Sequence, residues 1–278
     1  MPTVLERVTV LCFAMSYAAA LGLEIGHQAQ PRPIMRLLAL IFGGAGLLAH
    51  TIFIGVQPLA LASSQGSLLF LAWILAVFYL YGSIHHGRLT WGLFVLPLVL
   101  ALVVLAEIFP REEAARVGSL WDIVNIQGER FWGLVHGGLV LLAAVGVSVG
   151  FVASMMYLVQ VHRLKAKLAP GQGVKLLSLE RIEAMNRRAI LWSFPMLTAG
   201  LLVGVFLQVH QGSFTQDWLS PKILSTLGLW LVFGILLYLR YAAHARGRRV
   251  AWWTVAAFAL LLLALISPVH PFLQGGGP

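Results

Sequence analysis

The fold of this chain is decided by residues 132–161, which read WGLVHGGLVLLAAVGVSVGFVASMMYLVQV and contain no Asp, Glu, Lys or Arg. About 20 apolar residues are enough for a helix to cross the ~30 Å hydrocarbon core of a membrane. A helix over 131–161 would extend about 46 Å at ~1.5 Å per residue, so one of its ends is expected to project into water. The stretch therefore predicts a long membrane-spanning helix.

The rest of the chain has the same apolar character. Of its 278 residues, 59% are hydrophobic and 10% are charged, and the mean hydropathy is +0.87. This composition is far from that of a water-soluble domain. We predict an all-α, polytopic membrane protein of about eight transmembrane helices that form a single domain, residues 1–278. The other seven spans are expected at roughly 3–25, 37–56, 67–84, 89–108, 190–210, 222–241 and 250–270, and 67–84 is the shortest of them.

The first of these spans is interpreted as a retained helix and not as a cleaved signal peptide. Its apolar stretch is longer than a typical signal-peptide core, and Glu6 and Arg7 make a poor basic leader.

Positive charge is divided unequally between the two sides of the predicted bundle. Of the 19 lysines and arginines, 14 fall in or beside the loops of one side. Basic loops stay in the cytoplasm, so both termini are predicted to face outward from the inner or plasma membrane. The pI of about 10.3 reflects this insertion pattern and contacts with anionic lipids. Nucleic acid is not expected as a partner, because basic and aromatic residues are not interleaved.

The largest predicted cytoplasmic segment is residues 162–189. Within this segment, Ser178 is suited to cap the N-terminus of a short helix. Leu179, Ile182 and Met185 would give that helix one apolar face, because they recur at three-residue spacing. Two interpretations stay open: the face lies on the membrane surface as a connector, or it binds a partner protein.

Motifs of most other chemistries are missing. Cys12 is the only cysteine, and neither a phosphate-binding Gly-x-x-x-x-Gly-Lys loop nor a His-Glu-x-x-His metal motif occurs. Glu24 and Glu107 are expected at helix ends, so no carboxylate is predicted at the membrane midplane, where ion-coupled transporters place ionisable groups. A permease is therefore disfavoured.

The chemical signal lies in the histidines. Five of the nine fall in or beside cytoplasmic loops, where solvated residues are expected, but His50, His136, His210 and His270 fall near the outer ends of predicted spans. Neutral imidazole is a good axial ligand for haem iron, and helices can present two of them to opposite faces of a porphyrin. The alternative is structural, because a histidine at a helix end commonly bonds a backbone carbonyl or a lipid headgroup.

Local sequence favours two of these four histidines. Trp132 and His136 stand at i and i+4 and so share one helix face. The glycines that follow, from Gly137 to Gly150, allow close approach by a neighbouring helix or by a flat macrocycle. At the other end of the chain, Pro268 and Pro271 enclose His270 and make a rigid exit from the membrane.

The chain resembles the CcsA/HemX-type cytochrome c assembly proteins, which are integral-membrane proteins that handle haem on the outer side of the membrane. The resemblance covers most of the chain and is strongest from Trp132 onward. It is carried by Trp132…His136 (the family's Trp-x-x-x-His), by MMYLVQVHRLK at 155–165, LLSLE at 176–180 and SFPMLTAGLLVG at 193–204, by the position of His270, and, before these, by LFLAW at 69–73.

The resemblance implies an external site for a non-covalent, b-type haem. His136 and His270 would be the axial ligands of the iron, and the tryptophans would either pack on the porphyrin or anchor the helices at the interface. A basic residue, Lys222 or Arg130, would either pair with a propionate or remain a solvated charge. The candidate cofactor-binding residues are therefore His136, His270, His50, His210, Trp132, Trp218, Trp230 and Lys222.

Two departures from the family pattern bear on function. The family's Trp-rich segment leads into Asp-Pro-Lys, whereas here Trp218 leads into Ser220-Pro-Lys222. Where the family has a histidine after Tyr-Leu, this chain has Arg240, which cannot ligate iron because it stays protonated. These departures favour the HemX-like branch, which the resemblance links to haem biosynthesis, including control of glutamyl-tRNA reductase level.

We therefore predict a haem-binding membrane protein of cytochrome c assembly or haem homeostasis that is not an enzyme. Its expected partners are haem, membrane lipids, and either another assembly protein or a soluble enzyme of haem biosynthesis. The alternative is a membrane scaffold or regulator that acts through residues 162–189, with structural histidines.

Overall fold

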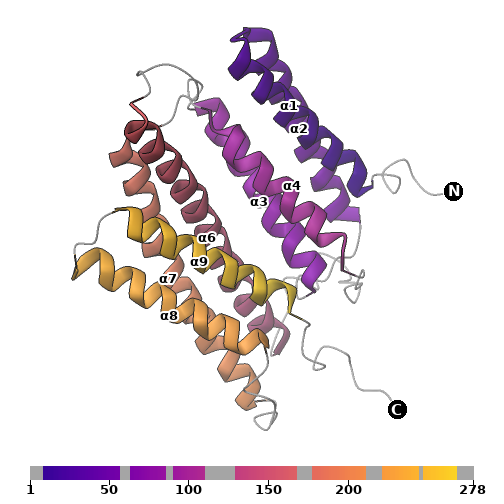
Figure 1. Cartoon of the computed structure of the whole chain (residues 1–278). Helices are drawn as coiled ribbons and strands as arrows, with labels where there is room; N and C mark the ends of the chain where they lie inside the picture. Colours follow the sequence, from indigo (N-terminus) through magenta and orange to yellow (C-terminus); the bar gives the residue numbers. More distant parts are fainter. Residues whose placement is uncertain are drawn as a thin grey trace, which may run out of the picture.

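The computed structural model of the chain describes residues 9–56, 63–85, 90–109, 129–167, 177–210, 221–243 and 247–267. Within these ranges it contains eight α-helices and no strand, which confirms the predicted all-α fold (Figure 1). The helices are α1 (Val10–Ala29), α2 (Pro33–Val56), α3 (Ser64–His85), α4 (Gly92–Ala106), α6 (Glu129–Lys165), α7 (Leu179–His210), α8 (Pro221–Tyr241) and α9 (Gly247–Ile266).

Seven of the eight helices are long and apolar enough to cross a membrane. Large apolar side chains cover their outward surfaces: Leu11, Trp192 and Leu202 are 73%, 69% and 67% exposed. In a protein of this composition such surfaces face lipid. The chain is thus a polytopic helical membrane protein.

Two predicted helix lengths were wrong. The third span, predicted as the shortest at 67–84, is the 22-residue helix α3, whereas α4 has only 15 residues where 89–108 was predicted. At ~1.5 Å per residue, α4 is about 22 Å long, which is less than the thickness of a hydrocarbon core. Pro97 lies inside α4 and removes one backbone donor from it.

The prediction of a short, separate loop helix after Ser178 was also wrong. Its start is as expected: α7 begins at Leu179, and the Ile182 N–H donates to the Ser178 carbonyl. It then continues without a break to His210. Of the three residues of its predicted apolar face, Ile182 is fully buried and Leu179 and Met185 are half-buried, so most of this face packs inside the protein.

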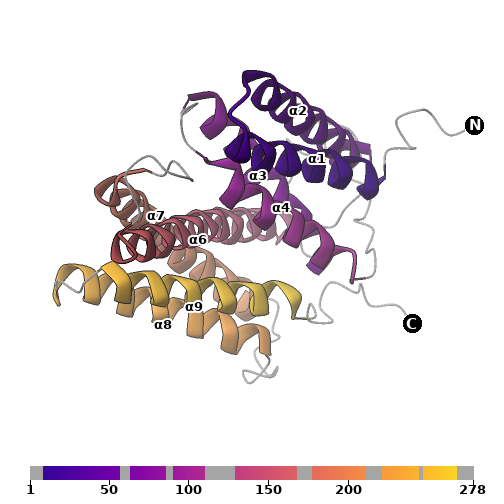
Figure 2. The same cartoon turned by 45° about the horizontal axis from the view of Figure 1, so that its top comes forward.

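The helices form four consecutive antiparallel pairs. In both views, the α3–α4 pair lies between α1–α2 and α6–α7, and α8–α9 covers the other side of α6–α7 (Figures 1 and 2). The alternation places the end of α6 and the starts of α7 and α9 together. We name this the basic end, because the arginine-rich loops adjoin it, and the opposite end the outer end.

Close helix approaches in the first half of the chain depend on glycine. A Cβ atom at Gly46 on α2 would lie 2.8 Å from Cε1 of Tyr17 on α1, and one at Gly43 would lie 2.6 Å from Cε1 of Tyr79 on α3. Contacts this short are not compatible with a real side chain. The fully buried tyrosine rings thus occupy the space that these two glycines leave.

One carboxylate lies deeper than predicted. Glu24 is more than one turn inside α1 and only 6% exposed, where the sequence placed it at a helix end. The Tyr79 hydroxyl donates to its Oε1 at 3.4 Å, and Gly92 of α4 packs against both side chains. Because this hydrogen bond satisfies part of a buried polar group, the carboxylate serves to connect α1, α3 and α4 near the basic end.

We expect Gly46→Ala to lower the stability of the protein, because the new methyl group would overlap the Tyr17 ring, and overpacking of this kind costs about 1–3 kcal/mol. The matched control is Gly44→Ala two residues away, where no atom lies within 4 Å of the added Cβ. Alanine there should be neutral or stabilising, since it is the better helix former. Thermal unfolding in detergent measures both, and equal midpoints would contradict the tight α1–α2 contact.

Candidate functional site

The outer end of the α6–α7 pair holds His136 in a defined orientation. Nδ1 of His136 lies 2.8 Å from the carbonyl oxygen of Gly200 on α7. A carbonyl oxygen can only accept, so Nδ1 must donate its proton. In the neutral ring the lone pair is then on Nε2, the nitrogen that can coordinate a metal.

Glycines on α7 make room for the ring. A Cβ atom at Gly204 would lie 2.9 Å from Cε1 and 3.1 Å from Nδ1 of His136, and one at Gly200 would lie 3.0 Å from Cγ2 of Val140. Gly200 and Gly204 are one turn apart on the same face of α7. Together they let α6 approach closely enough for the imidazole to reach the backbone of its neighbour.

Aromatic rings continue this site toward the outer end. The Trp132 ring lies 5.5 Å from that of Phe206, and the Phe206 ring stacks on His210 at 5.9 Å with an interplanar angle of 11°. Trp132 is 41% and Phe206 is 50% exposed. The structure thus brings Trp132, His136 and His210 together. The sequence prediction missed Phe206, although its i, i+4 spacing to His210 is a signal for it.

His50 belongs to a different part of the molecule. It is fully buried between α1 and α2, where its ring stacks on Phe13 at a centroid distance of 4.0 Å and its Nδ1 lies 3.4 Å from the Tyr17 hydroxyl. The α3–α4 pair separates this position from α6–α7 (Figure 1). His50 and His136 are therefore not brought together.

Trp230 is also placed away from His136. Its indole N–H donates to the Thr198 hydroxyl at 3.0 Å, and its ring stacks on Phe194 at 5.9 Å. Thr198 is only two residues before Gly200, the hydrogen-bond partner of His136, but at 3.6 residues per turn it lies about 200° around α7 from it, on another face of the helix. The contacts of Trp230 are thus those of a helix-packing residue.

Several predicted site residues lie outside the described residues. These are Trp218, His270 and the side chains of Lys222 and Arg130. The described part of α9 ends at Ile266, four residues before His270, at the same end of the bundle as His136. Within the described ranges, no three His, Cys, Asp or Glu side chains form a group that could hold a metal ion by themselves.

Comparison with known proteins gives the family. The family described as "Cytochrome C assembly protein" matches residues 61–269, three quarters of the chain. The chain belongs to the cytochrome c assembly protein family.

Individual relatives agree with this family. The protein HemX of Bacillus subtilis is 27% identical over 144 residues, 50% of this chain and 52% of the relative. HemX of Brevibacillus brevis is 28% identical over 205 residues, 72% of this chain and 71% of the relative. The cytochrome c biogenesis protein CcsA of Guillardia theta is 23% identical over 224 residues, 74% of this chain and 72% of the relative. The chain thus spans about half of the first relative and about seven tenths of the others. No solved structure matches it.

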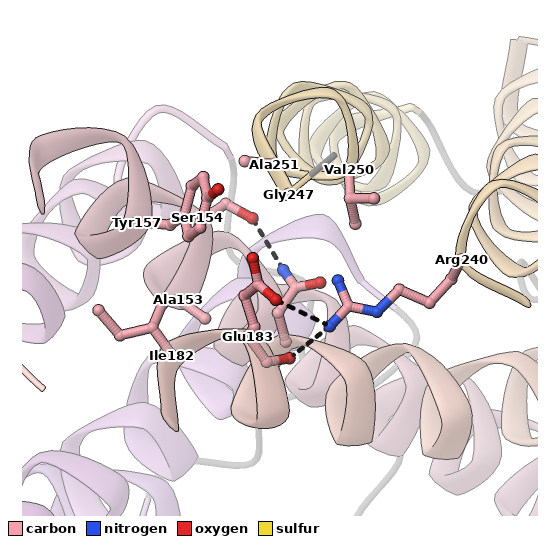
Figure 3. A pocket seen from close by; sticks show the side chains of 10 residues that line it. Ala153, Ser154, Tyr157, Ile182, Glu183, Arg240, Gly247, Val250 and Ala251 are labelled. Atoms are coloured by element: carbon pink, nitrogen blue, oxygen red, sulfur yellow. Dashed lines mark hydrogen bonds and ion pairs between the residues drawn. The ribbon is translucent and has the colours of Figure 1, made fainter. Parts of the chain in front are cut away.

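The family resemblance makes the contacts of Arg240 informative. One of its guanidinium nitrogens donates to the Glu183 carbonyl at 3.0 Å and lies 4.0 Å from the Glu183 carboxylate (Figure 3). The arginine that replaces the expected histidine is therefore engaged with α7 at the basic end. In this family member the position ties two helices together.

Two of the three described outer-half histidines, His50 and His210, should differ in chemical reactivity. We expect diethyl pyrocarbonate to modify His210, which is exposed at the end of α7, much faster than His50, which is 0% exposed and covered by Phe13. Peptide mass spectrometry of the labelled protein over time measures both rates. Labelling of His50 at the rate of His210 would show that His50 is accessible and that its placement here is wrong.

Proposed function

We propose that this chain binds a b-type haem non-covalently at its outer end, with His136 and His270 as the two axial ligands. The observation that carries the proposal is the hydrogen bond from His136 Nδ1 to Gly200, which orients the ring and leaves the lone pair of the neutral imidazole on Nε2. Membership of the cytochrome c assembly family supports haem as the group that is handled.

The surroundings of His136 fit a porphyrin. Trp132 and Phe206 provide half-exposed aromatic surface beside the imidazole, and large flat apolar groups pack well on such rings. A Cβ atom added at Gly133 or Gly137 on α6 would have no neighbouring atom within 4 Å, so a flat macrocycle could approach that helix closely. When bound, the haem would supply the iron, and the residues of the chain would hold and orient it.

The position of α9 supports His270 as the second ligand. α9 packs along α6 and ends at the outer end (Figure 2). His136 lies within the first eight residues of α6, at the same end. Pro268 and Pro271 restrict the backbone on both sides of His270. His136 would thus come from α6, and His270 from the segment that follows α9, a helix that packs on α6.

We assign the protein to haem handling in cytochrome c assembly or haem homeostasis, in the inner or plasma membrane, without catalytic activity of its own. Its protein partner would be another assembly protein or a soluble enzyme of haem biosynthesis. Names of its relatives, HemX and CcsA, support both routes.

A scaffold or regulator that acts through residues 162–189 is the second candidate. Arg181, Arg187 and Arg188 are exposed at the start of α7 and offer a cationic surface to an acidic soluble partner. The apolar face of the same segment offers little surface for this role, because Ile182 is fully buried and Leu179 and Met185 are half-buried. The second candidate therefore rests mainly on charge.

Haem titration of purified variants tests the first proposal. The wild type should give a low-spin Soret band, and His136→Ala and His270→Ala should each weaken haem affinity about tenfold or more, because each removes one axial ligand. His162→Ala, an exposed histidine of the basic end, is the control and should bind haem as the wild type does. A wild type that binds no haem would favour the scaffold candidate.

Gly204→Ala tests how His136 is positioned. The added methyl would push the ring away from the Gly200 carbonyl, so we expect haem affinity to fall although no ligand is lost, by about tenfold for a lost orienting contact. Gly234→Ala on α8, where no atom lies within 4 Å of the added Cβ, is the control. Unchanged haem affinity in Gly204→Ala, with the protein folded, would refute this role of the α6–α7 contact.

A further inference from the structure

A second polar site lies at the basic end, away from the candidate haem ligands. Asn186 of α7 is at its centre and is only 5% exposed. Its Nδ2 donates to the Gly150 carbonyl at 3.1 Å and to the Ser154 hydroxyl at 2.9 Å on α6, and lies 3.4 Å from the Thr254 hydroxyl on α9. One amide therefore contacts two neighbouring helices.

The contacts of Asn186 determine which way its amide points. The Gly150 carbonyl can only accept, so the amide nitrogen must face it and the oxygen must face away. Thr254 uses its own proton to donate to the Val250 carbonyl at 2.9 Å, so its oxygen is an acceptor for Asn186. Among the residues that the structure describes, Asn186 Oδ1 is buried and has no hydrogen-bond partner. A buried acceptor in this state destabilises the folded protein, because nothing replaces the hydrogen bonds it would make in water.

A small cavity adjoins the Asn186 side chain. Asn186 lines it together with Tyr157, Glu183, Arg240 and Gly247, which come from all four helices α6 to α9 (Figure 3). The space open to the centre of a water molecule is about 10 Å³. That is close to the minimum for one bound water, which also needs two to four polar partners. The lining supplies a carboxylate, a guanidinium and a phenol besides the amide.

We propose that this cavity binds one ordered water molecule, which donates to Asn186 Oδ1 and bridges it to the Glu183–Arg240 pair. The hydrated cluster fixes α9 against α6 and α7 at the basic end. The water satisfies Asn186 Oδ1, for which the described part of the protein offers no hydrogen-bond partner, while the amide nitrogen of the same side chain contacts α6 and α9.

Glycine makes this arrangement possible at the start of α9. Gly247 is the first residue of that helix, and a Cβ atom there would overlap the Glu183 carboxylate and the Tyr157 hydroxyl. The carboxylate thus lies against the N-terminus of α9, where the helix dipole favours negative charge. Farther along the same interface, Phe151 stacks on Phe258 at 4.3 Å.

A high-resolution cryo-EM map of the full-length protein, which shows ordered waters, tests the water site. We expect density about 3 Å from Asn186 Oδ1 in the wild type, at hydrogen-bond distance from Glu183 or Arg240 as well, and its loss in Asn186→Leu. If the wild-type map instead shows Oδ1 bonded directly to a protein group, or no density beside it, the water site is refuted.

Thermal unfolding of the same variant tests the connection between helices. Asn186→Leu keeps the branched shape but removes all three contacts, and the midpoint should fall by about 3 °C or more. The control is Ser148→Ala on α6, a buried side chain whose described hydrogen bond stays within its own helix, to the Ala144 carbonyl. A midpoint drop in Asn186→Leu no larger than that of the control would show that the cluster does not fix α9.

Discussion

The close packing of α7 on α6 is the constraint on which the other features of this protein depend. In lipid, helices gain little from burying apolar surface and associate through van der Waals contact and interhelical hydrogen bonds, which require small residues at the interface. Gly146 on α6 and Gly200 and Gly204 on α7 supply these: a Cβ at Gly146 would overlap the Ser193 hydroxyl, and one at Gly204 would press on the His136 ring. The short distance between the two helices that these glycines permit allows the His136 imidazole on α6 to bond the backbone of α7.

The C-terminal four helices have different chemistry at their two ends. At the outer end, Trp132, Phe206 and His210 leave aromatic and imidazole surface exposed around His136, as a site that receives a large flat ligand requires. At the basic end, Asn186 and the Glu183–Arg240 contact connect the helices around a cavity whose size suits about one water molecule. One end is therefore suited to bind a group and the other to hold the helices in register.

The membrane-spanning helices were largely predictable from sequence, because the lipid environment imposes a length and an apolar composition on every span. Local sequence was misleading at the start of α7. Its charged residues look like a water-exposed loop helix, but Ile182 and Asn186 are buried against neighbours that are distant in sequence. The starts of three helices follow known sequence preferences. Serine is favoured just before a helix, as Ser178 is before α7, and proline is favoured in the first turn, as Pro33 and Pro221 are in α2 and α8. The sequence could identify His50 and His136 as candidates, but only the arrangement of the helix pairs shows that α3–α4 separates them.

The most direct test of the proposed haem site is the low-temperature EPR spectrum of the ferric haem complex of the wild-type protein, because the g-values of the iron report its axial ligands. We expect a low-spin signal of bis-imidazole type, with His136 as one of the two ligands, and its replacement by a high-spin signal in His136→Ala. A high-spin wild-type spectrum, or a low-spin signal that persists unchanged in His136→Ala, would show that the α6–α7 contact does not present the ligand to the iron.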